Sequence, residues 1–537
     1  GAFINQPMSN NTLNSLRKQL TFDFMLDFTV ELTSEEVALL TLFENLDYSG
    51  FGTRLGRKEK VEPFRMMLLL IHGAMNSRTS SRELEKHVER DLFMKAVFGT
   101  DVHLDHSTIS RFISRNQKQI EDVFRQSVEK LASLGELGKK VVFQDGTKIE
   151  SRAGRYTFVW KSATEKNMEK CLSRIRSLLK EAADAGLVQT DEASFREPEK
   201  PLASAVSMID GQGLFNPSEK KGRGHRRSRI SRLREKAVEE LSKLEMQRKH
   251  LSMMDGRNSL SRTDTDATFM RMKEDHMRNG QLKPAYNIQN AVDSNYIIAS
   301  SISSDRTDYK AAGHILAKLD KLPWKYGIYC ADSGYDSLES FQELEKREIE
   351  AYIKPQDWEI SKTRSYRSDI GRSANMTYVE KDDCFICKNG KRLTFSGLRT
   401  SRKNSRPARV YECHRGCISC QYRQQCIRNH RKVRYKRLEV QLEHQKWQRI
   451  AHELLSTDFG AEVRANRSIQ VEGRFAFQKQ QFGLRRFSSF GKARVFSEWL
   501  VCCMAANTAQ LAARIEQGKV GTPFWYRIKA SPAEETA

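Results

Sequence analysis

Hydrophobic residues recur at helical spacing through the first quarter of the chain. The stretch "TSEEVALLTLFENL" opens with a Thr–x–x–Glu capping pattern and continues with apolar residues on one helical face. A second amphipathic stretch covers residues 78–99 and closes at Gly99. In "DHSTISRFISRNQKQI", which follows, Ser107 or Thr108 can cap a further helix. The pattern predicts that residues 33–135 are mostly helical.

Apolar runs of strand length come next and then alternate with helical patterns. Residues 139–160, "KKVVFQDGTKIESRAGRYTFVW", predict two strands around a Gly-containing turn, and residues 286–302 predict a hairpin turned at Asp293–Ser294–Asn295. A helix that ends at Pro323, the strand of "YGIYCADSGYDS", a second helix and the strand "AYIKP" follow. This order predicts an α/β fold in which helices flank a mixed sheet.

The remaining segments differ in composition. Residues 161–259 are charged and helix-prone, residues 356–438 hold six of the ten cysteines, and residues 439–516 show a helical pattern again. We therefore expect a helical N-terminal domain, an α/β core in two parts, a helical basic insertion, a small Cys-rich insertion, C-terminal helices that complete the core, and a tail. Their expected bounds are 1–135, 136–160 with 260–355, 161–259, 356–438, 439–516 and 517–537.

Composition and charge narrow the class of protein. At 537 residues the chain is too long for one hydrophobic core. Its formal net charge of +23 is typical of a protein that binds a polyanion, most often nucleic acid, with a membrane surface as the other candidate. No apolar stretch approaches the roughly 20 residues that span a bilayer, and no signal-peptide pattern opens the chain. We therefore expect a soluble, intracellular protein whose cysteines bind metal or stay reduced.

Two basic regions are candidates for contact with nucleic acid. The helix after Ser107 carries Arg111 and Arg115 on its exposed side, and with the preceding helix it suits a helix-turn-helix DNA-binding unit. An ordinary helical bundle with a solvated face fits the same pattern. The run at 220–236 holds nine Lys and Arg residues, which either contact phosphates or form a solvated, mobile segment. The candidate phosphate contacts in this run are Arg226, Arg227 and Arg229.

An aspartate ends each of two apolar strands, Asp145 after "VVF" and Asp332 after "IYCA". Burying an unpaired carboxylate is costly, so each either lies harmlessly at the surface or faces a cation. If the two strands are neighbours, both carboxylates emerge at one edge of the sheet. Mg²⁺ suits such a pair because it takes few carboxylates and keeps positions open for water and phosphate oxygens. Two such ions can activate an attacking hydroxyl and stabilise the leaving oxygen of a phosphoryl displacement.

A third acidic ligand usually completes such a site, and "RSIQVEGRFAFQKQQFGLRRF" offers Glu472 on a helix. The spacing places Phe475, Ala476 and Lys479 on the same helical face. A lone glutamate on a helix is normally solvated, so Glu472 is a candidate only because of the motif around it.

Four motifs together resemble a known family. "FQDGTKIESRAGRYTFVWK", "DATFMRMKEDHMRNGQLKPAYNIQNAVD", "ADSGYDS" and "NRSIQVEGRFAFQK" look like the DDE transposases of the 1182 group of bacterial insertion sequences, in order over roughly residues 35–510. The resemblance implies an RNase H-like catalytic domain in which Asp145, Asp332 and Glu472 bind two Mg²⁺ (or Mn²⁺) ions. It also implies that Lys479 contacts phosphate beside the cleavage site.

The last helix departs from the signature of related groups, which is Tyr–x2–Arg–x3–Glu–x6–Lys. Ser468 and Ala465 stand where strict spacing requires the arginine and the tyrosine. Arg467 comes one residue early and Arg464 about one helical turn away, and either can reach a phosphate. Because the tyrosine has no counterpart, the route of excision, with or without a hairpin intermediate, stays open.

The Cys-rich insertion has the spacing of a zinc-ribbon-like site. Cys384–x2–Cys387 and Cys417–x2–Cys420 form two pairs, an arrangement in which four thiolates hold structural Zn²⁺. The competing ligands are Cys413, His414 and Cys426. Reduced thiols without metal are the alternative. A closed four-thiolate site would shape this insertion and would not perform chemistry.

We therefore expect a DNA transposase of the bacterial cytoplasm, associated with the nucleoid. It would bind the terminal inverted repeats of its element, cut the DNA ends and join them to target DNA, as a homodimer because two ends must be brought together. Trp160 and Tyr156 either stack on an extruded base or belong to the core. Two alternatives remain: a catalytically silent, transposase-derived DNA-binding protein, and a metal-dependent nuclease without strand transfer.

Overall fold

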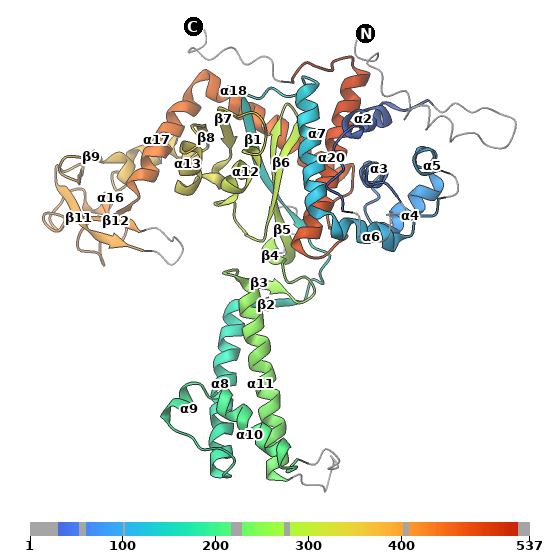
Figure 1. Ribbon diagram of the computed structural model, residues 1–537. Helices are drawn as coiled ribbons and strands as arrows, with labels where there is room; N and C mark the ends of the chain where they lie inside the picture. The colour runs from blue at the N-terminus through green and yellow to red at the C-terminus, as the bar shows by residue number, and fades with distance from the viewer. Residues whose placement is uncertain are drawn as a thin grey trace.

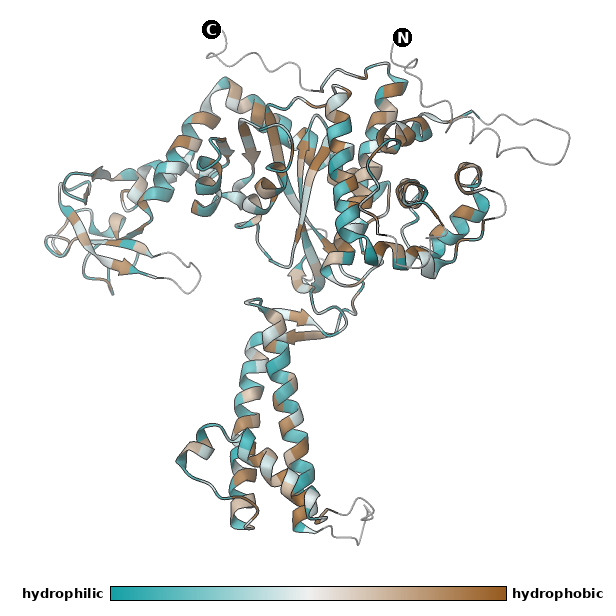
Figure 2. Ribbon diagram, viewed as in Figure 1, coloured by the Kyte–Doolittle hydropathy of each residue, from teal (hydrophilic) through white to brown (hydrophobic). Residues whose placement is uncertain are grey.

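The computed structural model describes residues 31–52, 61–99, 102–215, 228–272, 280–400 and 407–524. Three parts surround a central sheet: N-terminal helices on one side, a small β-rich part on the other, and a long two-helix arm that projects from it (Figure 1). Hydrophobic residues concentrate on the strands of the central sheet (Figure 2). No helix in the described ranges is long and apolar enough to cross a membrane. The architecture is α/β, as the order of elements predicts.

The N-terminal helices form within the predicted region, but the stretch 78–99, predicted as one helix, forms two, because Asp91 ends the first and its carboxylate caps the second. Capping boxes start two of them, at Thr33 with Glu36 and at Ser80 with Glu83. Asp105, and not Ser107 or Thr108, caps the helix that follows, because its carboxylate accepts the backbone N–H of Ser107. The helices are α2 (Ser34–Phe43), α3 (Pro63–Met75), α4 (Ser81–Arg90), α5 (Leu92–Phe98), α6 (His106–Arg115) and α7 (Gln117–Ser133).

The last long helix, α20 (Lys492–Glu516), connects the N-terminal helices with the central sheet. It packs against α2, α3 and α7 on one side and against the sheet on the other. Asn507 pairs with the backbone of Ile297 through two hydrogen bonds of 2.8 Å, and the Trp499 indole N–H donates to Ser300 Oγ at 2.8 Å. A helix that is apolar nearly all round belongs in a core, so the C-terminal segment completes the interior begun by the N-terminal half.

The central sheet is mixed, in the order β4-β5-β1-β7-β8, with β6 also paired to β5. The long strand β1 is antiparallel to β5 and parallel to β7, which is parallel to β8. Helices α12 (Ala311–Leu319) and α13 (Leu338–Glu345) form the crossovers between β6, β7 and β8. The strands are β1 (Val141–Glu150), β4 (Thr268–Arg271), β5 (Leu282–Asp293), β6 (Tyr296–Ser303), β7 (Ile328–Ala331) and β8 (Glu350–Ile353).

The predicted hairpin is present between β5 and β6. Ser294 and Asn295 form its two-residue turn with φ of +52° and +67°, as the tight turns of hairpins require. The two strands predicted within residues 139–160 also exist, but they do not form one sheet. β1 runs straight through Gly146, whereas β2 (Phe158–Trp160) pairs with β3 (Ser259–Ser261) at the base of the arm.

The arm leaves and returns through the β2–β3 pair. Its two long helices pack along each other and bury a core of their own, separate from that of the sheet. Its helices are α8 (Lys161–Asp184), α9 (Glu192–Arg196), α10 (Glu199–Gly211) and α11 (Arg229–Met254).

The Cys-rich part is a five-stranded antiparallel sheet in the order β13-β12-β11-β10-β9, with Phe385, Leu393 and Tyr411 in its core. Its elements are β9 (Thr377–Val379), β10 (Cys384–Ile386), β11 (Arg392–Arg399), β12 (Ala408–Glu412), the short helix α16 (Arg423–Cys426) and β13 (Arg437–Val440). The chain enters it through α14 (Trp358–Ser361), α15 (Arg364–Ser368) and η2 (Ser373–Asn375). It returns to the central sheet through α17 (Leu442–Ser456), α18 (Asp458–Arg467), η3 (Ser468–Glu472) and α19 (Gly473–Gln480).

Candidate active site

The parallel pairing of β1 with β7 places Asp145 beside Asp332. Phe143 lies opposite Cys330, so the residues two positions further on in each strand stand level. Asp332 follows β7 directly and caps the 3-10 turn η1 (Ser333–Tyr335), where its carboxylate accepts the N–H of Gly334 at 2.8 Å. Asp145 is only 8% exposed and lies in the middle of β1, where sequence reasoning placed a strand end. The pairing of β7 with β1 ends before Asp145, whereas β1 continues along β5. Asp145 therefore lies at an edge of the sheet because β7 is shorter than β1.

Glu472 reaches the same place through an irregular helix. Residues Ser468–Glu472 form a π-helical turn between α18 and α19, and this turn contacts β1 and β5. In an α-helix, residues five apart point about 140° away from each other, whereas a π-turn brings them onto one face. Arg467 and Glu472 are five apart, and Arg467 Nη2 lies 3.5 Å from Glu472 Oε1. The π-turn thus compensates for the one-residue displacement of Arg467 from the strict spacing.

Arg467 joins two of the three predicted carboxylates. Its Nη1 lies 3.8 Å from Asp145 Oδ2, and its side chain is 15% exposed. Nη1 is buried without a hydrogen-bond partner and interacts with Asp145 through charge, whereas Nη2 donates to Glu472 Oε1. Burial raises the pKa of the neighbouring Cys330 thiol to about 12, against the charges of Arg467 and Arg464. Clustered carboxylates repel, and Arg467 supplies a compensating positive charge.

Asp308 is a further carboxylate at this site that sequence reasoning missed. Its Oδ1 accepts from Asn287 Nδ2 at 2.7 Å and from Gln289 Nε2 at 2.8 Å. A side chain at Gly334 would lie 3.0 Å from Asp332 Oδ1 and 3.4 Å from Asp308 Oδ2, so the two carboxylates border the same point. An aspartate in a polar loop usually indicates a turn. The sequence therefore provided no reason to assign Asp308 to the candidate active site.

A buried polar network lies beneath the carboxylates. The Tyr329 hydroxyl donates to Gln144 Oε1 at 2.7 Å, Gln144 Nε2 donates to Gln289 Oε1 at 3.0 Å, and the Tyr335 hydroxyl also donates to Gln289. Burial raises the pKa of both tyrosines well above the ordinary value, and the charges of the nearby Asp145, Asp308 and Asp332 add to this. The two hydroxyls therefore remain donors, and the network holds the strands that carry the aspartates.

Two predicted DNA contacts, Lys479 and Arg464, lie on the helices next to Glu472. Lys479 lies half-buried on α19, and Arg464 places its guanidinium 4.9 Å from the centre of the Trp358 ring. The face expected to carry Glu472 and Phe475 together is divided, because Glu472 is exposed whereas Phe475 turns inward and stacks on Trp499.

The other predicted DNA contacts lie elsewhere in the fold. On α6, both Arg111 and Arg115 are exposed, and Arg111 also donates back to Ser107. Trp160, at the base of the arm, packs against Phe158 and Phe269, whereas Tyr156 is 80% exposed. Arg229 pairs with Glu181 on the arm at 3.3 Å, and Arg226 and Arg227 lie outside the described residues.

Most cysteines of the Cys-rich part converge on one small pocket of about 20 Å³. Those that line it are Cys387, Cys413, Cys417, Cys420 and Cys426. Cys384 does not line it. β10 covers Cys384–Ile386, and Cys387 follows it directly. Because side chains alternate along a strand, Cys384, 1% exposed, faces the side opposite to Cys387. The structure therefore places Cys413 and Cys426, predicted only as alternates, with Cys387, and separates Cys384 from them.

These groups differ in the ions they suit. Asp145, Asp308, Asp332 and Glu472 offer hard oxygen donors, which fit Mg²⁺ or Mn²⁺. The thiols offer soft donors that fit Zn²⁺. Burial, together with contacts with Cys417 and Cys387, raises the pKa of Cys413 to about 12, so this cluster disfavours thiolates until a cation joins them.

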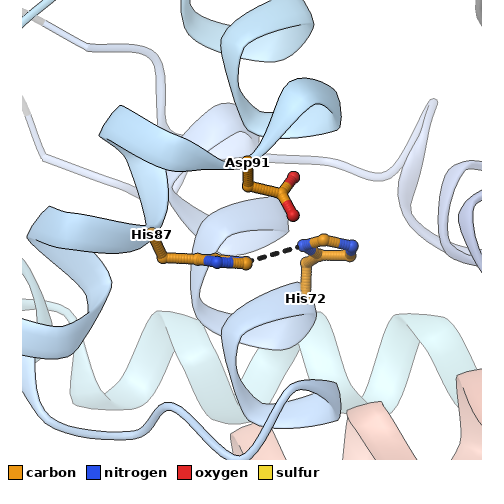
Figure 3. Close-up of side chains that lie close together, drawn as sticks. All are labelled: His72, His87 and Asp91. Atoms are coloured by element: carbon orange, nitrogen blue, oxygen red, sulfur yellow. Dashed lines mark hydrogen bonds between the residues drawn. The ribbon is translucent and has the colours of Figure 1, made fainter.

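His72, His87 and Asp91 form a compact cluster in the N-terminal helices (Figure 3). Arg78 Nη1 lies 2.6 Å from His87 Nδ1, and because arginine can only donate, Nδ1 accepts. His87 Nε2 therefore carries the proton and donates to His72 Nδ1 at 2.9 Å. With that proton in place His87 has no lone pair for an ion, so the cluster is a buried hydrogen-bond chain.

Comparison with known families supports a DDE transposase. A family model described as "Transposase DDE domain" matches residues 386–512, and one described as "Transposase domain (DUF772)" matches residues 15–115. The first match includes Arg467 and Glu472, and the second includes α2 to α6. No curated protein and no solved structure matches the chain.

Gly146→Ala should disturb the network beneath the site. Gly146 lies directly opposite Gln289, and an added Cβ would come within 2.2 Å of Gln289 Nε2. We expect a loss of about 1–3 kcal/mol in unfolding free energy, measured by urea denaturation. Gly327→Ala, with no atom within 4 Å of its Cβ, is the control and should change stability by less than about 1 kcal/mol. Equal effects of the two changes would contradict the packing described.

The His72–His87 chain should make stability depend on pH. Burial, helped by the neighbouring His72 and Arg78 and opposed by Asp91, lowers the pKa of His87 to about 4. The pKa of a histidine in the unfolded chain is about 6.5. At pH values between this pKa and that of folded His87, the unfolded chain binds a proton that the folded protein does not. Unfolding free energy should therefore fall as pH drops from about 7 towards 4. His87→Gln should flatten this fall, whereas His103→Gln, at an exposed site, should not. Parallel pH curves for wild type and His87→Gln would be the contrary result.

Proposed function

We propose that this protein is a DNA transposase of the DDE type, with Asp145, Asp332 and Glu472 as its catalytic carboxylates. The observation that carries the proposal is the β1–β7 register, which sets Asp145 level with Asp332, together with Arg467, which contacts Asp145 and Glu472. The transposase family matches support the class. The sheet order, with antiparallel β5 and β6 on one side of β1 and parallel β7 and β8 on the other, supports an RNase H-like core. The motifs favour the 1182 group.

In the mechanism, Asp145, Asp332 and Glu472 would hold two divalent ions, Mg²⁺ or Mn²⁺. When bound, these ions activate the attacking oxygen and stabilise the leaving oxygen of the phosphodiester. Asp308, fixed by Asn287 and Gln289, adds negative charge to the same site. Arg467 lies between Asp145 and Glu472 without a hydrogen bond to Asp145, so it can release them and donate to a phosphate oxygen of the DNA. Lys479 and Arg464 would contact the backbone nearby.

The substrate is double-stranded DNA, namely the terminal inverted repeats of the element and a target. The net charge of +23 supplies attraction to phosphates. The N-terminal helices, with Arg115 exposed on α6, and the basic arm would position the repeats. Strand transfer follows cleavage when a freed 3′-hydroxyl attacks target DNA. Two ends must react together, so the active assembly is a homodimer on DNA.

The Cys-rich part would hold a structural Zn²⁺. The ligands we favour are Cys387, Cys417, Cys420 and Cys426, with Cys413 as the remaining candidate, because all of them line one pocket. The pocket has room for a single ion. Bound zinc would relieve the repulsion between the thiolates and fix the end of β10, the loop that carries Cys417 and Cys420, and α16 to one another.

Neutralising any catalytic carboxylate should stop cleavage and spare DNA binding. We expect Asp145→Asn, Asp332→Asn or Glu472→Gln to reduce Mg²⁺-dependent nicking of a DNA end at least about a hundredfold, since metal stabilisation of the reacting oxygens is worth several kcal/mol. Gel assays with a labelled end, a target plasmid and Mg²⁺ measure nicking and joining together. Asp305→Asn, in an exposed loop, is the control.

Three outcomes separate the candidate functions. Joined product in the wild-type reaction supports transposition, and nicking without joining would indicate a nuclease. Specific binding without any cleavage would indicate a silent DNA-binding protein. Normal cleavage by Asp332→Asn would overturn the assignment of the carboxylates.

Zinc content should depend on the pocket cysteines. We expect purified protein to contain stoichiometric zinc by elemental analysis, and Cys417→Ser and Cys426→Ser to lose most of it. Cys384→Ser is the matched control, because Cys384 belongs to the same sheet but faces away from the pocket. If Cys384→Ser lost zinc and Cys426→Ser kept it, the sequence-based pairing would be right and the proposed ligand set wrong. Wild-type protein without zinc would indicate that these cysteines are reduced thiols that bind no metal.

A further inference from the structure

A groove of about 860 Å³ separates the N-terminal helices from the start of α20. Its walls are the first turn of α4, the middle of α6, the loop 486–490 and the first turns of α20. Arg152, two residues beyond the end of β1, also borders it. Neither Asp145, Asp332 nor Glu472 lines the groove, so it is separate from the candidate active site.

The groove is positively charged. Four arginines line it, and Arg82 has no ion-pair partner among the described residues. Arg152 donates to the backbone oxygen of Ser488 at 2.9 Å, and Arg494 donates to the hydroxyls of Ser110 and Ser114 on α6. The fourth arginine, Arg486, lies 3.9 Å from the Glu150 carboxylate and donates to the backbone oxygens of Ser151, Arg152 and Ala153, so it is committed within the protein. Arg152 and Arg494 donate only to neutral groups in these contacts, so their positive charge is not cancelled there.

The two acidic residues of the groove do little to cancel this charge. Glu83 is engaged in the capping box of α4 with Ser80. Glu498 is 8% exposed and accepts the N–H of Ser488 at 2.8 Å, and burial raises its pKa. Its contact with Ser488 also fixes the loop that carries the groove's aromatic residue.

Hydroxyls and one exposed aromatic ring complete the lining. Phe490 is 44% exposed, and the Arg152 guanidinium lies 5.3 Å from its ring centre. Arginines and hydroxyls are the usual partners of phosphates, and an exposed aromatic is the usual platform for a base. The lining hydroxyls belong to Thr79, Ser80, Ser81, Ser110, Ser488, Ser489 and Ser497.

The groove's size selects among DNA forms. Sites of roughly 300–1,000 Å³ enclose a drug-sized molecule, so the groove has room for one or two nucleotides. In a duplex the bases are also stacked inside and could not reach Phe490. The end of β1 lies about 16 Å from Asp145 at some 3.3 Å per residue, so one strand could span the groove and the active site.

We propose that this groove binds an unpaired segment of a DNA strand, with its phosphates on Arg82 and Arg494 and a base stacked on Phe490. The proposal deepens the proposed function, because the strand would be one that the transposase opens near the cleavage site. Binding can nevertheless be measured without cleavage, so the two ideas can fail separately.

The test uses the full-length protein and a labelled single-stranded oligothymidylate, with fluorescence anisotropy over a range of salt. Phe490→Ala should weaken binding roughly 5- to 100-fold, as loss of one stacked base does. Arg82→Gln should weaken it and reduce the salt slope by about 0.7, as loss of one phosphate contact to a single strand does. Both side chains are at the surface, and thermal unfolding of each variant checks that it is folded.

Matched controls lie in the Cys-rich part and on α15. Phe395 is 41% exposed with the Arg409 guanidinium 4.4 Å from its ring centre, so Phe395→Ala removes the same kind of pair outside the groove. Arg364→Gln removes the same charge from an exposed site. Neither should change single-strand affinity more than about twofold.

Two results would overturn the proposal. One is equal single-strand affinity for the groove variants and their controls. The other is a loss of affinity for a duplex alone, which would make the groove a contact for the duplex backbone. Asp332→Asn protein should bind the single strand normally. Wild-type protein that binds the single strand in the groove but cleaves no DNA would count only against the proposed catalysis.

Discussion

The pairing of β1 with β7 on one edge and β5 on the other is the constraint on which the site depends. The parallel partner sets Asp145 level with Asp332, and the antiparallel partner brings Gln289 across Gly146. A slip of one residue would turn Asp145 to the opposite face of the sheet. The relative positions of the carboxylates in the site therefore depend on this strand register. This explains why buried polar side chains, Gln144 and Tyr329 among them, tie the three strands together at this level.

Charge sets the second constraint. Asp145 is almost buried, and the other carboxylates lie near enough to raise the pKa of the two tyrosines beneath. Such a cluster needs positive charge to be stable. Arg467, at the end of α18, supplies it, and the π-turn that follows brings Glu472 onto the same side as Arg467. π-turns are rare and recur at functional sites. Here the irregular helix gives the last carboxylate a direction that a regular helix with this spacing could not give.

The sequence predicted what depends on neighbours along the chain. The capping pattern at Thr33, the turn at Ser294 and Asn295, and Asp332 directly after an apolar strand are all local signals. It did not predict what depends on tertiary contacts. Asp308 resembles any turn residue until β5 supplies its donors. Cys384 fits a zinc pair by spacing, but the strand it belongs to turns it away from Cys387.

The helix α20 links these local and distant features. It packs on the N-terminal helices and on β6, and Arg494 in its first turn holds α6 through two serine hydroxyls. The loop just before it carries Phe490 and is anchored by Glu498 of the same helix. Arg82 lies on α4 and Arg152 lies beyond β1. A ligand that contacts both can bind only when the N-terminal helices are packed against the central sheet. Binding stabilises the state that is bound, so DNA in the groove would strengthen the junction between the helical unit and the sheet that carries the carboxylates.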